Sequence, residues 1–377
     1  MTDIKMVDLQ SQYKNIKTEV DTEIEKVINS TAFINGPIVK DFQKNLADYL
    51  NVKHVITCGN GTDALQISMM ALGLKPGDEV ITSNFTFVAT VEVIALLGLT
   101  PVLIDVYDDN FTINIEKLEQ AITPKTKAIV PVHLFGQAAD MEKILKIAQK
   151  HNLKIIEDTA QAIGSDYYFS DGTTKKLGTI GDIGCTSFFP SKNLGCFGDG
   201  GAIFTNNDKL AETLRSVVNH GMEVRYYHDK VGVNSRLDSI QAAILNVKLK
   251  HLDEYNNARR KAAEFYDNAF KDCKKLITPE RSDFSRHIFH QYTLKLIDAD
   301  RTKLIDYLKT KNIPAMVYYP VPLHLQKAYR SKRYKDGDFP ITEKLSKIVF
   351  SLPMHTELTK EQLNYITTNV LEFLKNE

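Results

Sequence analysis

The chain has 377 residues, of which 43% are hydrophobic and 25% charged, a composition typical of a soluble globular protein of two or three domains. Lysine plus arginine equals aspartate plus glutamate at 47 each, so no global basic field favours nucleic acid or an anionic membrane as a partner. The four cysteines lack C-x-x-C spacing, and no apolar run approaches the ~18 residues of a membrane span. Without an apolar stretch of signal-peptide length at its start, the sequence predicts a cytoplasmic protein with no metal site.

Apolar periodicity divides the chain into helices and strands. A first helix is expected over 16–29 and a second begins at Gly36-Pro37, whereas residues 8–13 look like an arm that packs on something larger. From 54 to 205, short apolar strands alternate with helical segments, a pattern that predicts a mostly parallel α/β sheet. The expected strands include 54–58, 80–83, 101–106, 127–134 and 153–158.

The C-terminal part shows a second alternation of helices and strands. A helix over 208–219, capped by Asp208, precedes a long helix whose apolar stripe begins at Leu237. This long helix is expected to connect a large domain with an N-terminal arm, 1–250, to a small α/β domain, 251–377. In the small domain the sequence predicts a strand over 290–297, a helix over 300–311, a strand over 315–319 and a closing helix behind a capping box at 359–362.

The stretch 185–201 combines a buried strand, a turn, Lys192 and four glycines among the nine residues that follow this lysine. Glycine at this density marks backbone that bends sharply or passes close to another group. A lysine in such a loop is more often solvated than functional. Held between buried strands, however, an amine loses its proton more easily and can form a Schiff base. Cys196, in the same loop, is interpreted as structural.

Partners for such a lysine stand at the end of an earlier strand. Asp158 and Gln161 follow the apolar run 153–156, at the carboxyl edge where open α/β sheets bind their ligands. A pyridoxal phosphate (PLP) enzyme needs a lysine, a carboxylate on the pyridinium nitrogen and a phosphate cradle. Lys192 and Asp158 can supply the first two. His133 ends a neighbouring strand, and we interpret it as a structural histidine.

An anion site is predicted where the strand 54–58 leads into a helix. The segment 59–64 also fits the Gly-x-Gly-x-x-Ala fingerprint of dinucleotide-binding proteins. That interpretation needs an acidic residue at the end of the next strand, and Asp78 and Glu79 precede the strand instead. Under either interpretation, the helix N-terminus and the Thr62 hydroxyl can hold an anion.

Four motifs in order along the chain resemble those of the DegT/DnrJ/EryC1/StrS family of PLP-dependent nucleotide-sugar aminotransferases: Asn60-Gly-Thr-Asp-Ala-Leu65, Asp158-Thr-Ala-Gln161, Ser187-Phe-Phe-Pro-Ser-Lys192 and Gly198-Asp-Gly-Gly201. The resemblance extends from about residue 5 to the C-terminus. It implies PLP fold type I, the aspartate aminotransferase-like fold, in which a large domain with a mostly parallel seven-stranded sheet is followed by a small α/β domain.

The resemblance also implies roles for single residues. Lys192 would hold the cofactor as a Schiff base and move protons, and Asp158 would keep the ring nitrogen protonated. The other implied cofactor contacts are Gly61, Thr62 and Ser187 at the phosphate, Gln161 at the ring hydroxyl, Phe87 against the ring, and Asn234 at the phosphate of the neighbouring subunit. The active unit would thus be a homodimer with shared sites.

The implied substrates are glutamate and a keto-sugar nucleotide. The motifs are most similar to those of members that act at C3 of UDP-2-acetamido-2-deoxy-3-oxo-glucuronate for O-antigen synthesis. A dTDP-3-oxo- or UDP-4-oxo-6-deoxyhexose is the alternative. Substrate contacts are expected from Arg236, Tyr318, Tyr319, His324 and Arg225, although Tyr318 replaces a histidine of the uronate pattern and His324 departs from it too.

Other interpretations of these residues stay open at this point. Arg225 could equally lie in a solvated loop, and Asn234 could cap a helix while Arg236 forms a surface ion pair. A sugar dehydratase of the same fold would carry a histidine in place of Lys192. A DNA-binding regulator would need a helix-turn-helix segment or a basic patch, and the sequence contains neither.

Overall fold

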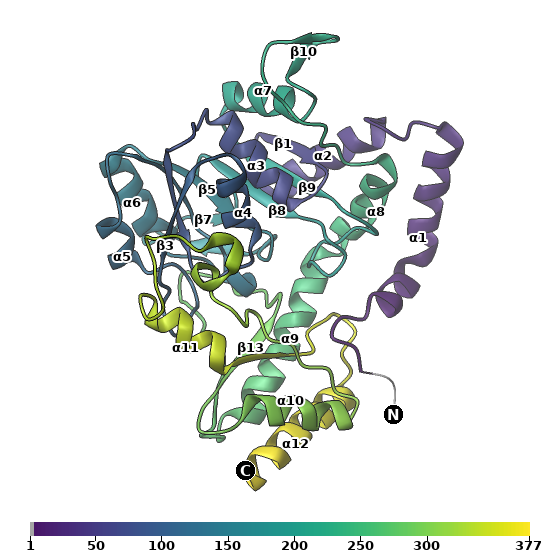
Figure 1. Cartoon of the computed structure of the whole chain (residues 1–377). Helices are drawn as coiled ribbons and strands as arrows, with labels where there is room; N and C mark the ends of the chain where they lie inside the picture. The colour runs from purple at the N-terminus through teal and green to yellow at the C-terminus, as the bar shows by residue number, and fades with distance from the viewer. Residues whose placement is uncertain (1–3) are drawn as a thin grey trace.

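The structure is a computed structural model that describes residues 4–377. Its centre is a seven-stranded sheet (Figure 1). Six strands run in the same direction, and β9 lies antiparallel to both of its neighbours, β1 and β8. In spatial order the strands are β1 (His54–Cys58), β9 (Gly201–Thr205), β8 (Ile183–Ser187), β5 (Lys154–Asp158), β4 (Thr126–Val130), β2 (Glu79–Ser83) and β3 (Thr100–Ile104). The predicted mostly parallel sheet is confirmed.

Helices cover both faces of this sheet, and alternate strand residues serve the two faces. On one face, Ile56, Val80 and Ile156 pack with α3 (Gly61–Ala71), α4 (Ala89–Leu96) and α7 (Asp208–Val217). On the other, their chain neighbours Val55, Ile81 and Ile155 pack with α5 (Ile115–Gln120) and α6 (Met141–His151) at one end of the sheet, and with α2 (Pro37–Leu50) and α8 (Ser239–Lys250) at the other. Because both faces are buried, the strands are near-continuous apolar runs.

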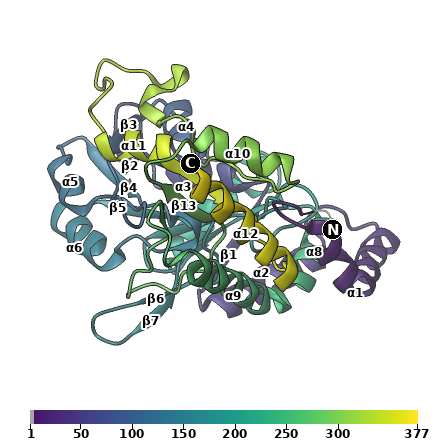
Figure 2. The same cartoon turned by 90° about the horizontal axis from the view of Figure 1, so that it is seen from below.

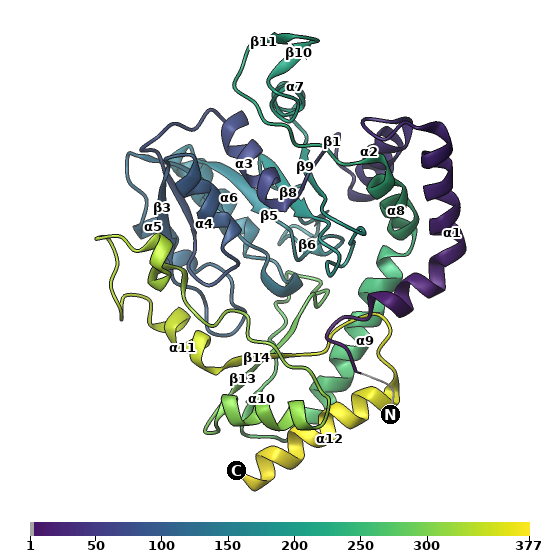
Figure 3. The same cartoon turned by 45° about the vertical axis from the view of Figure 1, so that its right-hand side comes forward.

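A second layer of structure lies below the large sheet. Helix α9 (Leu252–Phe270) descends to a three-stranded antiparallel sheet of β12 (Leu276–Ile277), β13 (Tyr292–Leu296) and β14 (Val349–Leu352) (Figure 3). Helices α10 (Arg301–Thr310) and α12 (Lys360–Asn376) cover this sheet when the molecule is seen from below (Figure 2). The predicted domain boundary at residue 250 falls where α8 ends, and the division into domains stays a prediction.

Several local expectations need correction. Helix α1 (Leu9–Ser30) begins seven residues earlier than predicted, because Asp8 accepts a hydrogen bond from the N–H of Ser11 and caps it, so the expected arm is largely helical. Asn207, not Asp208, caps α7. No strand forms over 315–319. Only Met316 pairs there, with Ser351 of β14, and β14 and α11 (Pro340–Ile348) were not expected.

Two antiparallel hairpins lie outside the large sheet. One is formed by β6 (Asp166–Tyr168) and β7 (Thr174–Lys176), and the other by β10 (Met222–Val224) and β11 (Tyr227–His228). The β10–β11 hairpin projects from the body beyond α7, at the top of Figures 1 and 3. The capping box predicted at Thr359 and Gln362 is present at the start of α12. Within residues 4–377, no helix combines the length and hydropathy required to cross a bilayer.

Candidate active site

Lys192 lies in the loop between β8 and β9, at the edge of the sheet where the parallel strands end. Its N–H donates to the carbonyl of Phe189 at 2.8 Å, which closes a tight turn, and its side chain is partly buried. Burial lowers the pKa of the amine from 10.5 to about 8, and the negative charge of Asp158 opposes this shift. Among residues 4–377, no group accepts a hydrogen bond from Nζ. The amine is therefore available as a nucleophile.

Asp158 is the last residue of β5 and is buried. Its carboxylate accepts hydrogen bonds from the N–H of Ala160 and from the Thr90 hydroxyl, each at 3.1 Å. Burial raises the pKa of Asp158, whereas these two bonds and the charge of Lys192 lower it. Thr90 was not predicted from the sequence. The available signal was its place in the first turn of the helix that follows β2, at the same edge of the sheet.

Gln161 joins the sheet edge to the C-terminal part of the chain. Its Oε1 accepts from the N–H of Phe135 at 2.7 Å, and its Nε2 donates to the Tyr319 hydroxyl at 3.1 Å. The ring of Phe87, exposed by 55%, lies 6.2 Å from that of Tyr319. Tyr318 is half-buried beside it. The structure thus brings Gln161, Phe87 and both tyrosines together, and their roles at the cofactor and the substrate stay predictions.

The residues predicted to form a phosphate cradle lie at the N-terminus of α3. Asn60 caps this helix: its side chain accepts a hydrogen bond from the N–H of Asp63, and its carbonyl accepts one from the N–H of Ala64. The N–H groups of Gly61 and Thr62 are the donors left at the helix end. A Cβ on Gly61 would lie 2.6 Å from Cβ of Ser187, so only glycine lets the Ser187 side chain approach these donors. The N–H groups of Gly61 and Thr62, the Ser187 hydroxyl and the positive end of the helix dipole together fit a phosphate.

The segment 234–236 adjoins this cradle. Ser235 accepts from the N–H of Gly59 at 2.8 Å and donates to Asp63 at 2.6 Å, which fixes the segment to the loop before α3. Asn234 is exposed and Arg236 is half-buried. The alternative in which Asn234 caps a helix is wrong, because the cap of α8 is Asp238. Arg236 forms no ion pair within the described residues.

Two predicted substrate contacts lie away from this cluster. His324 is buried, with Nδ1 at 2.7 Å from Asn84 and Nε2 at 3.2 Å from Glu343, so its ring faces protein rather than a substrate. We therefore correct the assignment of His324 to a supporting position behind the site. Arg225 lies on the projecting hairpin with its guanidinium over the ring of Tyr226, 4.9 Å from the ring centre. Within one chain it does not join the site.

The two residues interpreted as structural, His133 and Cys196, are both buried and hydrogen-bonded to protein groups, as a structural role requires. His133 is fully buried, with Nε2 at 3.0 Å from Glu157 and Nδ1 accepting from the N–H of Ala139. Cys196 is buried, and its thiol donates to the carbonyls of Phe188 and Gly198. Burial raises the pKa of this thiol to about 11, which makes it a poor nucleophile.

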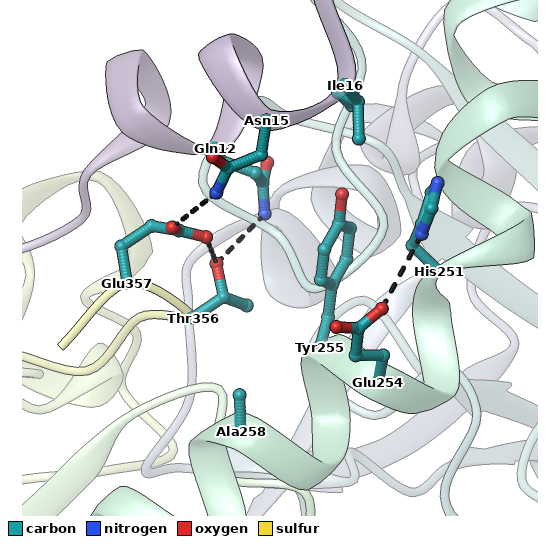
Figure 4. A pocket seen from close by; sticks show the side chains of 9 residues that line it. All are labelled: Gln12, Asn15, Ile16, His251, Glu254, Tyr255, Ala258, Thr356 and Glu357. Carbon is teal, nitrogen blue, oxygen red and sulfur yellow. Dashed lines mark hydrogen bonds and ion pairs between the residues drawn. The ribbon is translucent and has the colours of Figure 1, made fainter. Parts of the chain in front are cut away.

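A separate cavity of about 340 Å³ lies between α1, the start of α9 and the loop before α12 (Figure 4). Gln12 and Asn15 point from α1 to Thr356 and Glu357 and are hydrogen-bonded to them at 3.3 and 2.8 Å. None of the predicted site residues lines this cavity, so it is distinct from the active site.

Comparison with known proteins decides the family. The model of the DegT/DnrJ/EryC1/StrS aminotransferase family matches residues 14–371. The chain belongs to this family. It is therefore a PLP-dependent sugar aminotransferase, and the predicted family, enzyme class and cofactor are confirmed.

Three relatives align with this sugar aminotransferase over nearly their whole length. A pleiotropic regulatory protein from Geobacillus stearothermophilus is 46% identical, with 99% of both chains covered. A UDP-2-acetamido-2-deoxy-3-oxo-D-glucuronate aminotransferase from Pseudomonas aeruginosa is 44% identical over 96% of this chain and 98% of the relative. A UDP-N-acetyl-3-dehydro-alpha-D-glucosamine 3-aminotransferase from Acidithiobacillus ferrooxidans is 43% identical, with 97% of both covered.

Solved structures of relatives share the fold of this aminotransferase. DesV from S. venezuelae, solved with a ketimine intermediate, superposes with a TM-score of 0.95 at 35% identity, covering 100% of this chain and 99% of DesV. NtdA from Bacillus subtilis, solved with bound cofactor PMP, gives 0.91 at 33% identity, covering 100% of this chain and 86% of NtdA. The predicted fold class is confirmed.

Proposed function

We propose that this aminotransferase transfers the amino group of glutamate to C3 of UDP-2-acetamido-2-deoxy-3-oxo-glucuronate, in the cytoplasm, for the synthesis of a cell-surface polysaccharide such as O-antigen. The observation that carries the proposal is the 44% identity, over 96% of the chain, to the relative named for that reaction. The 43% identical relative named for a UDP-linked 3-dehydro-glucosamine supports the nucleotide and the carbon atom, but its sugar has no carboxylate.

The site residues divide between holding the cofactor and moving protons. When bound, PLP supplies the electron-withdrawing ring that makes the donor C–H bond acidic. Gly61, Thr62 and Ser187 would hold its phosphate, and Asp158, Gln161 and Phe87 its ring. Lys192 would carry the cofactor and, once displaced by the donor amine, accept and return the proton. A pKa of about 8 suits an amine that does so near neutral pH.

Arg236, Tyr318 and Tyr319 would face the sugar nucleotide. The guanidinium of Arg236 forms no ion pair within residues 4–377, and its planar fork can bind a diphosphate or a uronate carboxylate through two hydrogen bonds. Because the arginine belongs to the family motif, it does not by itself select a uronate.

A panel of keto-sugar nucleotides with ¹⁵N-glutamate tests the substrate. We expect transfer of the label to the 3-oxo-glucuronate, with kcat/KM at least about tenfold above that for the UDP-3-oxo sugar without the carboxylate, the effect of one charged contact. Efficient turnover of dTDP-3-oxo-6-deoxyhexoses or UDP-4-oxo-6-deoxyhexoses, with none of the uronate, would refute the proposal.

We further propose a homodimer in which Asn234 reaches the phosphate of the neighbouring subunit. Asn234 is exposed, and its side chain makes no hydrogen bond among the described residues of one chain. The preceding segment exposes large apolar side chains at Val224, Tyr226, Tyr227 and Val231, by 62%, 74%, 68% and 86%. Apolar side chains gathered at this density on a projecting hairpin favour burial against a partner.

Mixing two inactive variants tests the shared site. Lys192→Ala and the double variant Asn234→Ala/Arg236→Ala should each be nearly inactive alone. If sites are shared, a mixed dimer has both defects in one site and an intact second site, so activity recovers to about half per mixed dimer. No recovery from dimers shown to exchange subunits, or an active monomer at assay concentration, would contradict sharing.

One relative carries a regulatory name, so catalysis itself needs a direct test. An enzyme that holds PLP on Lys192 absorbs visible light, and the band should bleach when glutamate is added. A colourless protein that does not take up PLP would overturn the assignment of Lys192.

A further inference from the structure

Three polar side chains on α8 and α9 bind the loop that carries Lys192. Gln241 accepts from the N–H of Phe197 at 2.8 Å, Lys248 donates to the carbonyl of Gly195 at 2.6 Å, and Asn256 accepts from the side chain of Asn193 at 2.7 Å. The three residues, which we call the α8–α9 stripe, are spaced by about two helical turns each. The stripe runs antiparallel to the loop, so that Gln241, Lys248 and Asn256 contact Phe197, Gly195 and Asn193 in turn.

The loop needs support from outside because its own sequence gives little rigidity. Gly195, Gly198, Gly200 and Gly201 leave its backbone more freedom than other residues would. Backbone bonds within the loop join the N–H of Lys192 to Phe189, that of Cys196 to Phe188 and that of Phe188 to Gly200. The side chain of Asn193, the carbonyl of Gly195 and the N–H of Phe197 instead bind partners outside the loop. The segment 193–197 is where the stripe binds.

Lys248 is the charged member of the stripe and is unusual in its burial. Its side chain is only 1% exposed, and burial lowers its pKa to about 8. A buried lysine is costly unless its ammonium has a good partner, and a methionine would fill the same space. The 2.6 Å bond to Gly195 is short, as charge-assisted hydrogen bonds are.

Asn193 extends the support from the other side. Its Oδ1 lies 3.2 Å from Nδ1 of His290, and its Nδ2 also approaches the carbonyl of Ile288 at 3.4 Å. Asn193, Asn256 and His290 are all buried. The residue directly after Lys192 is thus held by groups from α9 and from the segment before β13.

We infer that Gln241, Lys248 and Asn256 are positioning residues for Lys192, holding the loop so that the amine faces Asp158 from a buried position. The inference rests on the proposed role of Lys192. Because a displacement of about 1 Å of a reacting group can cost ~10²-fold in rate, release of the loop should lower turnover without touching the substrate contacts.

Lys248→Met and Asn256→Ala test the inference, with Lys250→Met as control because Lys250 is exposed on the same helix. We expect kcat of the loaded enzyme to fall by about tenfold to a hundredfold in both variants, with KM for the sugar nucleotide within about twofold. In apoprotein, the pH midpoint of PLP loading should rise by about one unit, because a loosened Lys192 is better solvated. Only burial and Asp158 shift the Lys192 pKa, so the lost charge of Lys248 does not itself move the midpoint.

The outcomes separate the two hypotheses. Borohydride reduction and peptide mapping of the wild type first show whether Lys192 carries the cofactor. A different labelled lysine would refute the proposed role of Lys192, and the positioning role would fall with it. With Lys192 labelled, lower thermal stability in both variants but unchanged kcat and loading midpoint would overturn the positioning role. Should Lys248→Met fail to fold, Asn256→Ala and Gln241→Ala carry the test.

Discussion

Replacing Asp158 by asparagine tests the electrostatics of Lys192. Burial lowers the pKa of this amine to about 8, and the charge of Asp158 works in the opposite direction. At pH 7, a pKa of 8 leaves about a tenth of the amine neutral, against about one part in three thousand at 10.5. The change in pKa corresponds to about 3 kcal/mol. Without the charge of Asp158, the pKa should fall below 8.

The rate at which apoprotein takes up PLP measures this pKa, because only the neutral amine attacks the cofactor aldehyde. Followed by visible absorbance between pH 6 and 10, the wild type should show a midpoint near 8. In Asp158→Asn the midpoint should move to lower pH. Turnover of the loaded variant should nevertheless fall by about tenfold to a hundredfold, the worth of one charged hydrogen bond.

Asp199→Asn is the matched control, since it removes the same charge from an exposed residue of the lysine loop. Its loading midpoint should equal that of the wild type. A wild-type midpoint near 10.5 would contradict the burial of Lys192. A midpoint that rises in Asp158→Asn would contradict the sign of the interaction.

Three further changes test single contacts. Lys192→Ala should abolish transamination while PLP still binds non-covalently, measured by equilibrium dialysis; full turnover would refute the assignment. Gly61→Ala should weaken PLP binding about tenfold or more, because the new methyl group overlaps Ser187 at 2.6 Å and overpacking of this kind costs about 1–3 kcal/mol; unchanged affinity would contradict the cradle. Thr90→Val removes a donor that favours ionised Asp158, so the pKa of Asp158 should rise and PLP affinity should fall most at the acidic end of the pH range; a pH-independent loss would contradict this reasoning.

The sequence was most informative where a residue's role follows from its position at the end of its own strand or the start of its own helix. Asp158 ends an apolar strand, and Gly61 opens a helix, so the local pattern alone predicts that both lie at the carboxyl edge of the sheet. Lys192 stood out because glycines and buried strands surround it. The alternation of strands and helices was sufficient for the sheet, since each strand is buried on both faces.

Contacts between distant segments could not be predicted in the same way. The hydrogen bond from Gln161 to Tyr319 spans 158 residues, and nothing local to either residue indicates it. His324 illustrates the opposite error: a histidine near the predicted substrate tyrosines is buried against Asn84 and Glu343. The strand expected over 315–319 fails for a related reason, because β14 takes the place beside β13.

Lys192, which is partly buried, and Lys248, which is fully buried, show how this fold separates support from chemistry. Both Lys192 and Lys248 have a pKa lowered to about 8 by burial, so the burial of each opposes stability near neutral pH. Lys248 has a carbonyl partner at 2.6 Å, whereas the amine of Lys192 has no acceptor among the described residues. A lysine with a partner can hold a loop, and a lysine without one is free to react. In this arrangement α8 and α9 bind the glycine-rich loop at Asn193, Gly195 and Phe197 and leave the amine of Lys192 without a partner.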